Sequence, residues 1–475
     1  MTKKNLIIIL IFLPGILWSQ TYKILELPTA IRLAADSSIM IRKALSEYRI
    51  ACREYEIYKA YQKPSLTLNM TPGQYNRNII RRYVSEEDRD VYRAQQALYS
   101  YGQFSIKQNV GFTGGTLFIN SDLGYYQTFG ENSYKQITTV PVSFGYSQQL
   151  IGYNAFKWDK KIETEKMRVA RQKLSYAMEA NAINVSTLYC ESMQAQMQIE
   201  LAQEYKSICD TLYNQGCYQG EIGHMSKSDL LILKLEQAKA SNRLSDAKIQ
   251  FQNSLQNLYD YIGCTMSDSI VFVIPSVPSN IKISLQDAIQ LALQNSPLQG
   301  ERKMAVLIAQ QEIDKAKKQR YMEATLDVTV GFNQVANYFR EAYKKTMRQE
   351  MLSVGLTIPL VDWGIRKRHL ANAKEALENA ELDETECRLR ITREVSYLLQ
   401  TYRQNLKDLY MMQEAIDVAN QLAQESLRKF ALGRESIDDL LENNQRVNTA
   451  RLDYIVKLKE CWSNYYSIRL YTLCD

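Results

Sequence analysis

Residues able to carry out chemistry are scattered along the 475-residue chain rather than grouped. The two histidines, His224 and His369, lie far apart, and none of the eight cysteines forms a C-x-x-C pair, so no zinc-type ligand cluster is expected. The chain contains no G-x-S-x-G, H-E-x-x-H or phosphate-binding loop, the short motifs that most often accompany catalysis. Carboxylates are plentiful, but most carboxylates on exposed helix faces are solvated charges. We therefore expect no enzyme, no cofactor and no metal site.

The charge and composition exclude two further classes of protein. The net charge of +6 arises from 58 basic and 52 acidic residues that are spread along the chain, whereas binding to nucleic acid requires a concentrated basic patch. With 45% hydrophobic and 23% charged residues, the chain is neither a disordered protein nor a bundle of membrane helices.

The N-terminus has the pattern of a secretory signal peptide. Lys3 and Lys4 precede the apolar run Leu6–Leu17, and Ser19 supplies a small residue near its end. We assign residues 1–20 to a signal peptide and expect export; an uncleaved anchor is the alternative. No later apolar run is long enough for a membrane helix. A membrane segment of the mature chain would therefore have to be a β-barrel, because only helices and closed barrels satisfy the backbone in lipid.

The chain repeats itself. Residues 27–71 match residues 285–329 at a shift of 258, with 13 identities in 45 positions. Residues 143–153 match residues 353–363 at a shift of 210, and this shift continues to 223–231 and 433–441. The first copy therefore carries 258 − 210 = 48 additional residues between about Thr71 and Ser143. We expect repeat one at 21–262, a linker at 263–283 and repeat two at 284–475.

Long helices alternate with short strands in both copies. Glycine and proline are absent from 29–63, 153–215, 224–262, 365–432 and 434–475, and these stretches are rich in helix-forming residues. The longest would form helices of roughly 100 Å, which persist only in a coiled coil or helical barrel. Between them, apolar and polar residues alternate, as in 352–358. Such strands fit a barrel with lipid outside and water inside, although a half-buried sheet in a soluble domain has the same pattern.

The segment 72–140, which holds the 48 additional residues of copy one, contains two alternating runs around Thr113-Gly114-Gly115, a plausible hairpin turn. Residues 81–90 are charged and are expected to form an exposed loop. The sequence leaves open whether this insertion is an extracellular elaboration or an added pair of barrel strands.

Taken together, these features resemble the TolC-like outer membrane efflux proteins. The segment 354–373 is similar to the family's strand-to-helix junction, with Pro359 and the pair Trp363-Gly364 before an Ala-rich helix. Residues 291–299 and 430–450 resemble the Asn-Pro segment and the turn between long helices. The resemblance implies an α+β membrane protein: a homotrimer whose outer-membrane β-barrel continues as a long α-helical barrel in the periplasm.

The same resemblance assigns roles to several residues. The turns at Gly223 and Gly433 would dock a periplasmic adaptor, and the acidic residues beyond them, Asp439, Glu442 and Asp229, would ring the periplasmic aperture. Asp439 and Glu442 share a helix face, and acidic rings favour and hold cations. These carboxylates are equally explained as solvated groups favoured by the helix dipole. Glu435 stands where well-known members have arginine, so the links that close the pore are expected to differ.

The expected function is that of the outer-membrane channel of a tripartite efflux or secretion system, a passive conduit gated at its periplasmic end. Its partners would be an adaptor and an inner-membrane transporter of the resistance-nodulation-division or ABC type, in addition to outer-membrane lipid and two further copies. The alternative is an exported coiled-coil protein or a periplasmic adaptor without a channel. The sequence does not identify the cargo.

Overall fold

The computed structural model describes residues 23–84, 88–130, 133–222, 225–263, 270–279, 281–320, 322–432 and 434–473. The predicted signal peptide lies outside these residues. The chain forms two compact units: one comprises Met1–Ala44, Ser175–Leu291 and Glu394–Asp475, the other Leu45–Leu174 and Ala292–Arg393. Each is described by itself below.

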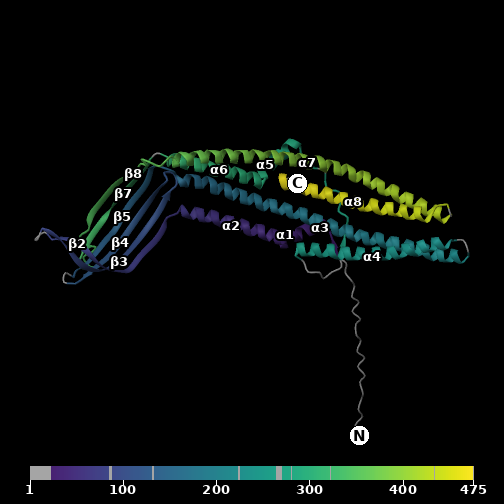
Figure 1. The fold of residues 1–475 in the computed structure, drawn as a ribbon, viewed down its shortest axis with the longest axis horizontal. Helices are drawn as coiled ribbons and strands as arrows, with labels where there is room; N and C mark the ends of the chain where they lie inside the picture. The colour runs from purple at the N-terminus through teal and green to yellow at the C-terminus, as the bar shows by residue number, and fades with distance from the viewer. Residues whose placement is uncertain are drawn as a thin grey trace, which may run out of the picture. The chain divides into compact units, whose positions relative to one another are not determined.

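The helices of the two repeats have almost the same lengths. Repeat one contains α1 (Leu27–Ser37), α2 (Ile39–Tyr61), α3 (Ala155–Glu221) and α4 (Lys227–Ile262), and repeat two contains α5 (Leu285–Asn295), α6 (Pro297–Lys318), α7 (Ile365–Ala431) and α8 (Ile437–Thr472). Both α3 and α7 have 67 residues, and both α4 and α8 have 36. The duplicated helical plan expected from the sequence is present (Figure 1).

A serine divides the first helical stretch of each repeat. Residues 29–63 were expected to be one helix because they contain no glycine or proline, but α1 ends at Ser37 and α2 begins at Ile39. Ser38 has extended backbone angles, and its Oγ accepts a hydrogen bond from the N–H of Ile41 (3.3 Å). Ser296 has the same place before α6. Serine side chains compete for backbone hydrogen bonds and so favour caps over helix interiors.

Six strands form one antiparallel sheet in the second unit, side by side in Figure 1. Their order is β2 (Ser65–Val84), β3 (Arg89–Val110), β4 (Gly115–Phe129), β5 (Lys135–Ile151), β7 (Glu323–Ala336) and β8 (Met347–Thr357). Within the described residues, β2 and β8 are the edge strands, each with one neighbour. Repeat one supplies four strands of this sheet and repeat two supplies two.

The insertion of copy one lies in the sheet. Strands β3 and β4 are hydrogen-bonded along their length, from Gln96 opposite Phe129 to Val110 opposite Gly115. The turn between them places Gly114 at a φ of +80°, a left-handed conformation that glycine adopts at little cost. The expected loop at 81–90 is largely wrong: Arg81–Val84 belong to β2, and residues 89–90 begin β3. The remaining residues 85–87 lie outside the described part.

The first unit is held together by helix packing and by a small parallel pair of strands. Strand β1 (Lys23–Leu25) pairs with β6 (Ile270–Phe272), and the buried hydroxyl of Tyr189 on α3 lies within hydrogen-bond distance of the carbonyl oxygens of Leu25 (2.8 Å) and Val273 (2.7 Å). Among the described residues, none of the helices is both long and apolar enough to cross a membrane. Cys209 and Cys217, which are eight residues apart in the sequence, are both free thiols.

Candidate functional site

The helices that follow the two long-helix turns begin with the same cap. In α8 the N–H of Asp439 donates to Oγ of Ser436 (3.1 Å), and the Ser436 hydroxyl donates to Oδ2 of Asp439 (2.6 Å). In α4 Ser226 and Asp229 repeat these contacts at 3.1 and 2.8 Å. The serine satisfies an N–H that has no partner within the helix, and a carboxylate in the first turn interacts favourably with the helix dipole. Both aspartates therefore stabilise helix starts.

Glu442 lies one turn beyond Asp439, on an exposed part of α8. Its carboxylate pairs with Arg446 at 2.7 Å, and the two side chains are 63% and 57% exposed. A pair this exposed contributes at most about 1 kcal/mol. Both residues line a shallow groove of about 590 Å³ between α7 and α8, whose other residues include Met412 and Asp453. Glu442 thus presents its charge to solvent and pairs with Arg446, whereas the exposed Asp439 carboxylate accepts a hydrogen bond from the Ser436 cap.

Glu435 is held inside its own helical hairpin. Its Oε1 accepts hydrogen bonds from Oγ of Ser426 on α7 (2.8 Å) and from Nδ2 of Asn443 on α8 (3.2 Å). Asn443 also contacts the Ser426 hydroxyl at 3.2 Å, and Ser426 is 2% exposed. Its other oxygen, Oε2, is buried and has no hydrogen-bond partner among the residues that the structure describes. Glu435 therefore joins α7 to α8 across the turn.

The equivalent place in repeat one is apolar. At the shift of 210, Ser426, Glu435 and Asn443 become Gly216, Met225 and Leu233. A Cβ on Gly216 would lie 2.8 Å from Cδ1 of Leu233 and 3.0 Å from Sδ of Met225, so these three residues are also in contact. Leu233 is buried together with Leu212 and Leu440 in one cluster.

The turns themselves are only partly described. Gly223 and Gly433, the expected docking residues, lie outside the described part of the chain. Beside them, Ile222 and Leu432 are described and are 53% and 68% exposed. The docking assignment for the two glycines stays a prediction.

The strand-to-helix junction has a specific geometry. Strand β8 ends at Thr357, so Ile358 and Pro359 lie beyond the ladder. Trp363 and Gly364 have φ angles of +53° and +79°, a left-handed pair that immediately precedes α7. Trp363 is 85% exposed.

Asp362, which sequence reasoning missed, fixes this turn. Its two carboxylate oxygens accept hydrogen bonds from the N–H groups of Gly364 (3.0 Å) and Arg366 (3.2 Å). These backbone donors favour the charged form and lower the pKa of Asp362 below its ordinary value. The Arg366 guanidinium in turn donates to the carbonyl oxygen of Gln319 at the end of α6 (2.7 Å).

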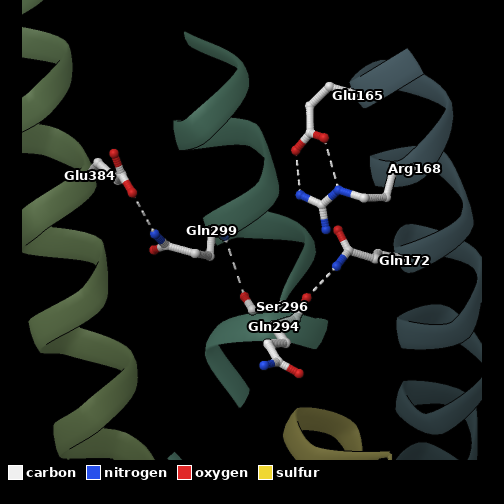
Figure 2. A network of polar contacts seen from close by, with 7 residues as sticks. All are labelled: Glu165, Arg168, Gln172, Gln294, Ser296, Gln299 and Glu384. Carbon is white, nitrogen blue, oxygen red and sulfur yellow. Dashed lines mark hydrogen bonds and ion pairs between the residues drawn. The ribbon is translucent and has the colours of Figure 1, made fainter. Parts of the chain in front are cut away.

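A polar network in the second unit holds the three helices α3, α6 and α7 in register (Figure 2). The buried Gln299 on α6 donates through Nε2 to Glu384 of α7 (3.1 Å). Gln172 on α3 donates to the carbonyl oxygen of Gln294, which precedes the Ser296 cap (2.6 Å). The break between α5 and α6 is therefore tied to both long helices.

The contact among Ser426, Glu435 and Asn443 was not predicted, although it left a signal in the repeat alignment. The spacings between these residues, nine and eight positions, do not by themselves indicate a contact, because the residues lie on either side of a turn. Their joint replacement by Gly, Met and Leu at the shift of 210 would have indicated that the three side chains meet.

The geometry of long paired helices and an open, two-edged sheet agrees with what comparisons with known proteins show. Residues 288–460 match the family model of the outer membrane efflux proteins. Over this segment the chain is similar to the outer membrane efflux proteins. No curated protein matches its sequence. The fold is similar to that of solved structures described as a membrane protein from Pseudomonas aeruginosa (TM-score 0.67, 14% identity, covering 94% of this chain and 90% of that chain) and the CmeC outer membrane channel of Campylobacter jejuni (0.66, 12%, 94% and 85%). A third similar structure is the open state of the Neisseria gonorrhoeae MtrE outer membrane channel, with a TM-score of 0.62 and 14% identity; the match covers 94% of this chain and 89% of that chain.

The resemblance to outer membrane efflux proteins that the sequence predicted is borne out over residues 288–460, where that family's model matches. The α+β fold class is confirmed by the fold itself.

Proposed function

We propose that three copies of this chain form the exit duct of a tripartite efflux or secretion system. Their sheets close one barrel in the outer membrane, and their long helices continue it as a tunnel in the periplasm. The duct is a passive conduit that opens and closes at its periplasmic end. It receives its cargo from an inner-membrane transporter, of the resistance-nodulation-division or ABC type, through a periplasmic adaptor.

The observation that carries this proposal is the open sheet with two unlike faces. Apolar side chains on one face are exposed in the single chain, including Leu68 (51%), Phe144 (55%) and Leu352 (72%). Open strand edges are not tolerated in lipid, so a membrane sheet of this kind must close on further copies. Antiparallel edges β2 and β8 suit such closure, because neighbouring strands then alternate in direction around the ring.

The rival function is that of an exported coiled-coil protein or a periplasmic adaptor. A six-stranded sheet with an exposed apolar face argues against both, because in a soluble protein it would be a site of aggregation.

Fractionation and electrophysiology test the duct directly. The expressed protein is expected in the outer membrane, as an oligomer that dissociates on heating, and to produce defined conductance steps in planar bilayers. A soluble periplasmic monomer without conductance would refute the proposal.

The acidic residues beyond the turns belong to the proposed aperture. In a trimer, Asp439 and Glu442 would bring six carboxylates around the axis, a ring that binds divalent cations. The double variant Asp439→Asn and Glu442→Gln removes this charge while keeping side chains of the same shape, and should weaken block of the single-channel current by divalent cations about tenfold. Asp229→Asn should have a smaller effect, because Ile232 stands where repeat two has Glu442.

A matched control for the aperture is Glu425→Gln. Glu425 forms a comparably exposed pair with Arg428 on α7 (2.8 Å, 57% and 72% exposed). Cation block that is unchanged in the double variant, or equally reduced by Glu425→Gln, would contradict an acidic ring at Asp439 and Glu442.

A further inference from the structure

The insertion of repeat one forms part of the wall of the sheet rather than an outgrowth from it. Strand β3 is paired with β2 from Ser65 opposite Lys107 to Val84 opposite Arg89, and β4 is paired with β5 from Thr116 opposite Ser147 onward. The hairpin β3–β4 therefore separates β2 from β5 along the whole sheet. An extracellular elaboration would instead leave β2 and β5 paired with each other.

The hairpin continues both faces of its neighbours. One row is apolar and at least 37% exposed on five of the six strands, and it consists of Leu66, Ile106, Ile119, Phe144 and Val330; on the edge strand β8 it ends at Glu350. The adjacent row, on the opposite face, is small or polar and consists of Thr67, Ser105, Asn120, Ser143 and Gly331. Since side chains alternate between faces along a strand, the hairpin has the same apolar and polar sides as the strands beside it.

Contacts along the polar row connect the hairpin to the strand before it. The Ser105 hydroxyl donates to Oδ1 of Asn120 (2.7 Å), and the Thr67 hydroxyl donates to the carbonyl oxygen of Ser105 (3.3 Å). On the same face, the ring of Phe118 occupies the space where Gly145 lacks a side chain. An aromatic ring over a strand glycine pins the register of the two strands. Strands β2, β3, β4 and β5 are therefore fixed to one another across both ends of the insertion.

We propose that the hairpin β3–β4 widens the pore: three copies with six strands each close an 18-stranded barrel, in place of the 12-stranded barrel that two strands per repeat would give. This inference rests on the proposed trimeric duct. With strands about 4.8 Å apart and tilted by about 40°, a ring of 18 strands measures about 36 Å between opposite backbones and a ring of 12 about 24 Å. Barrels of 16 to 18 strands enclose an open aqueous channel. The small, polar inner row suits bulky, hydrated cargo.

A deletion designed from the repeats tests the width. Removing residues 79–126 takes out the 48 additional residues. The variant keeps residues 65–78 and 137–147, which correspond to strand residues 323–336 and 347–357 of repeat two. Residues 127–136 join them and correspond to the ten-residue loop 337–346. Electron cryomicroscopy of both proteins in lipid nanodiscs should show 18 strands in the full chain and 12 in the variant, with the diameter reduced by about one third.

Cysteine labelling tests the same inference on the full-length chain, independently of whether the deletion variant folds. In a background with the native cysteines replaced by serine, Lys107→Cys and Ile106→Cys place neighbouring thiols on the two faces of β3; both native side chains are exposed in the single chain. In intact outer membranes a hydrophilic maleimide should label position 107 at least about tenfold faster than position 106, because thiolates form only in contact with water.

The outcomes separate the two proposals. A trimeric ring of 12 strands in the full chain, or equal labelling at 106 and 107, overturns the widened barrel and leaves the duct intact. The absence of any trimeric ring in the membrane overturns the duct itself.

Discussion

The two repeats differ far more in their strands and in their hairpin tips than in their helices. Corresponding helices agree in length to within one residue, from 11 residues in α1 and α5 to 67 in α3 and α7. In contrast, repeat one supplies four strands to the main sheet and repeat two supplies two. At the tips, a polar cluster around Glu435 in repeat two replaces an apolar cluster around Met225 in repeat one. The two repeats therefore share the lengths of their helices and differ in the segments beyond the helix ends, which are the strands at one end and the hairpin turns at the other.

The largest effect is expected from placing the polar residue of repeat two in the apolar cluster of repeat one. Leu233→Asn buries an amide without partners beside Gly216 and Met225, and should reduce the free energy of unfolding by about 3 to 4 kcal/mol. Ile232→Asn is the control, since Ile232 is 39% exposed. Thermal unfolding followed by circular dichroism compares the two, and equal effects would show that the apolar cluster does not matter.

The reverse exchange, an apolar residue in the polar cluster of repeat two, should lower the free energy of unfolding by a smaller amount. Glu435→Met removes the carboxylate that accepts from the buried Ser426 and the half-buried Asn443, and should lower the free energy of unfolding by about 1 to 3 kcal/mol. Adding Ser426→Gly and Asn443→Leu copies the apolar cluster of repeat one and should restore part of this loss, because the unpaired groups are removed together. If the triple variant has a midpoint of thermal unfolding no higher than that of Glu435→Met, the two clusters are not equivalent.

The helix caps should behave alike in both repeats. Ser226→Ala and Ser436→Ala each remove the acceptor of an aspartate N–H and should cost about 1 kcal/mol. The double variant should show the sum, since the two caps share no partner. Ser228→Ala, in the first turn of α4, serves as control with little expected change. Chemical denaturation measures the free energy of unfolding of all four variants. If Ser226→Ala and Ser436→Ala have strongly unequal effects, the caps of α4 and α8 do not contribute alike.

The smallest effect is expected at the junction before α7, where repeat one has Gly152 in place of Asp362. Because the folded pKa of Asp362 is lowered, its stabilisation is present above the unfolded pKa of about 3.9 and is lost as the pH falls through the folded pKa. Asp362→Asn should therefore speed amide exchange at Gly364 and Arg366 at neutral pH. The difference from the unchanged protein should disappear in acid. A difference that persists at all pH values would exclude the carboxylate as its cause.

The sequence predicted the elements well where one residue type decides the backbone. The stretches 224–262 and 434–475, which contain no glycine or proline, located α4 and α8. The turn at Gly114 follows from local chemistry, and the alternation from Leu352 to Leu356 identified β8. The predicted apolar face included Ile358, which lies beyond the end of β8 at Thr357.

Contacts between distant segments could not be predicted in the same way. The segment expected to be a loop at 81–90 forms strand at both ends because its own opposite charges meet across the hairpin, where Arg81 forms an ion pair with Asp90. The Ser38 break was hidden because a serine has no fixed effect inside a helix. The Glu435 cluster depends on α7 and α8 lying together, which no local pattern describes.

The hairpin β3–β4 adds strands in a pair, and this has a consequence for how such proteins diversify. A pair leaves the chain running in its original direction, so β5 still delivers it to the start of α3 at Ala155. Insertion of a hairpin therefore changes the number of strands in steps of two and leaves the lengths of the helices unchanged, as the two repeats show.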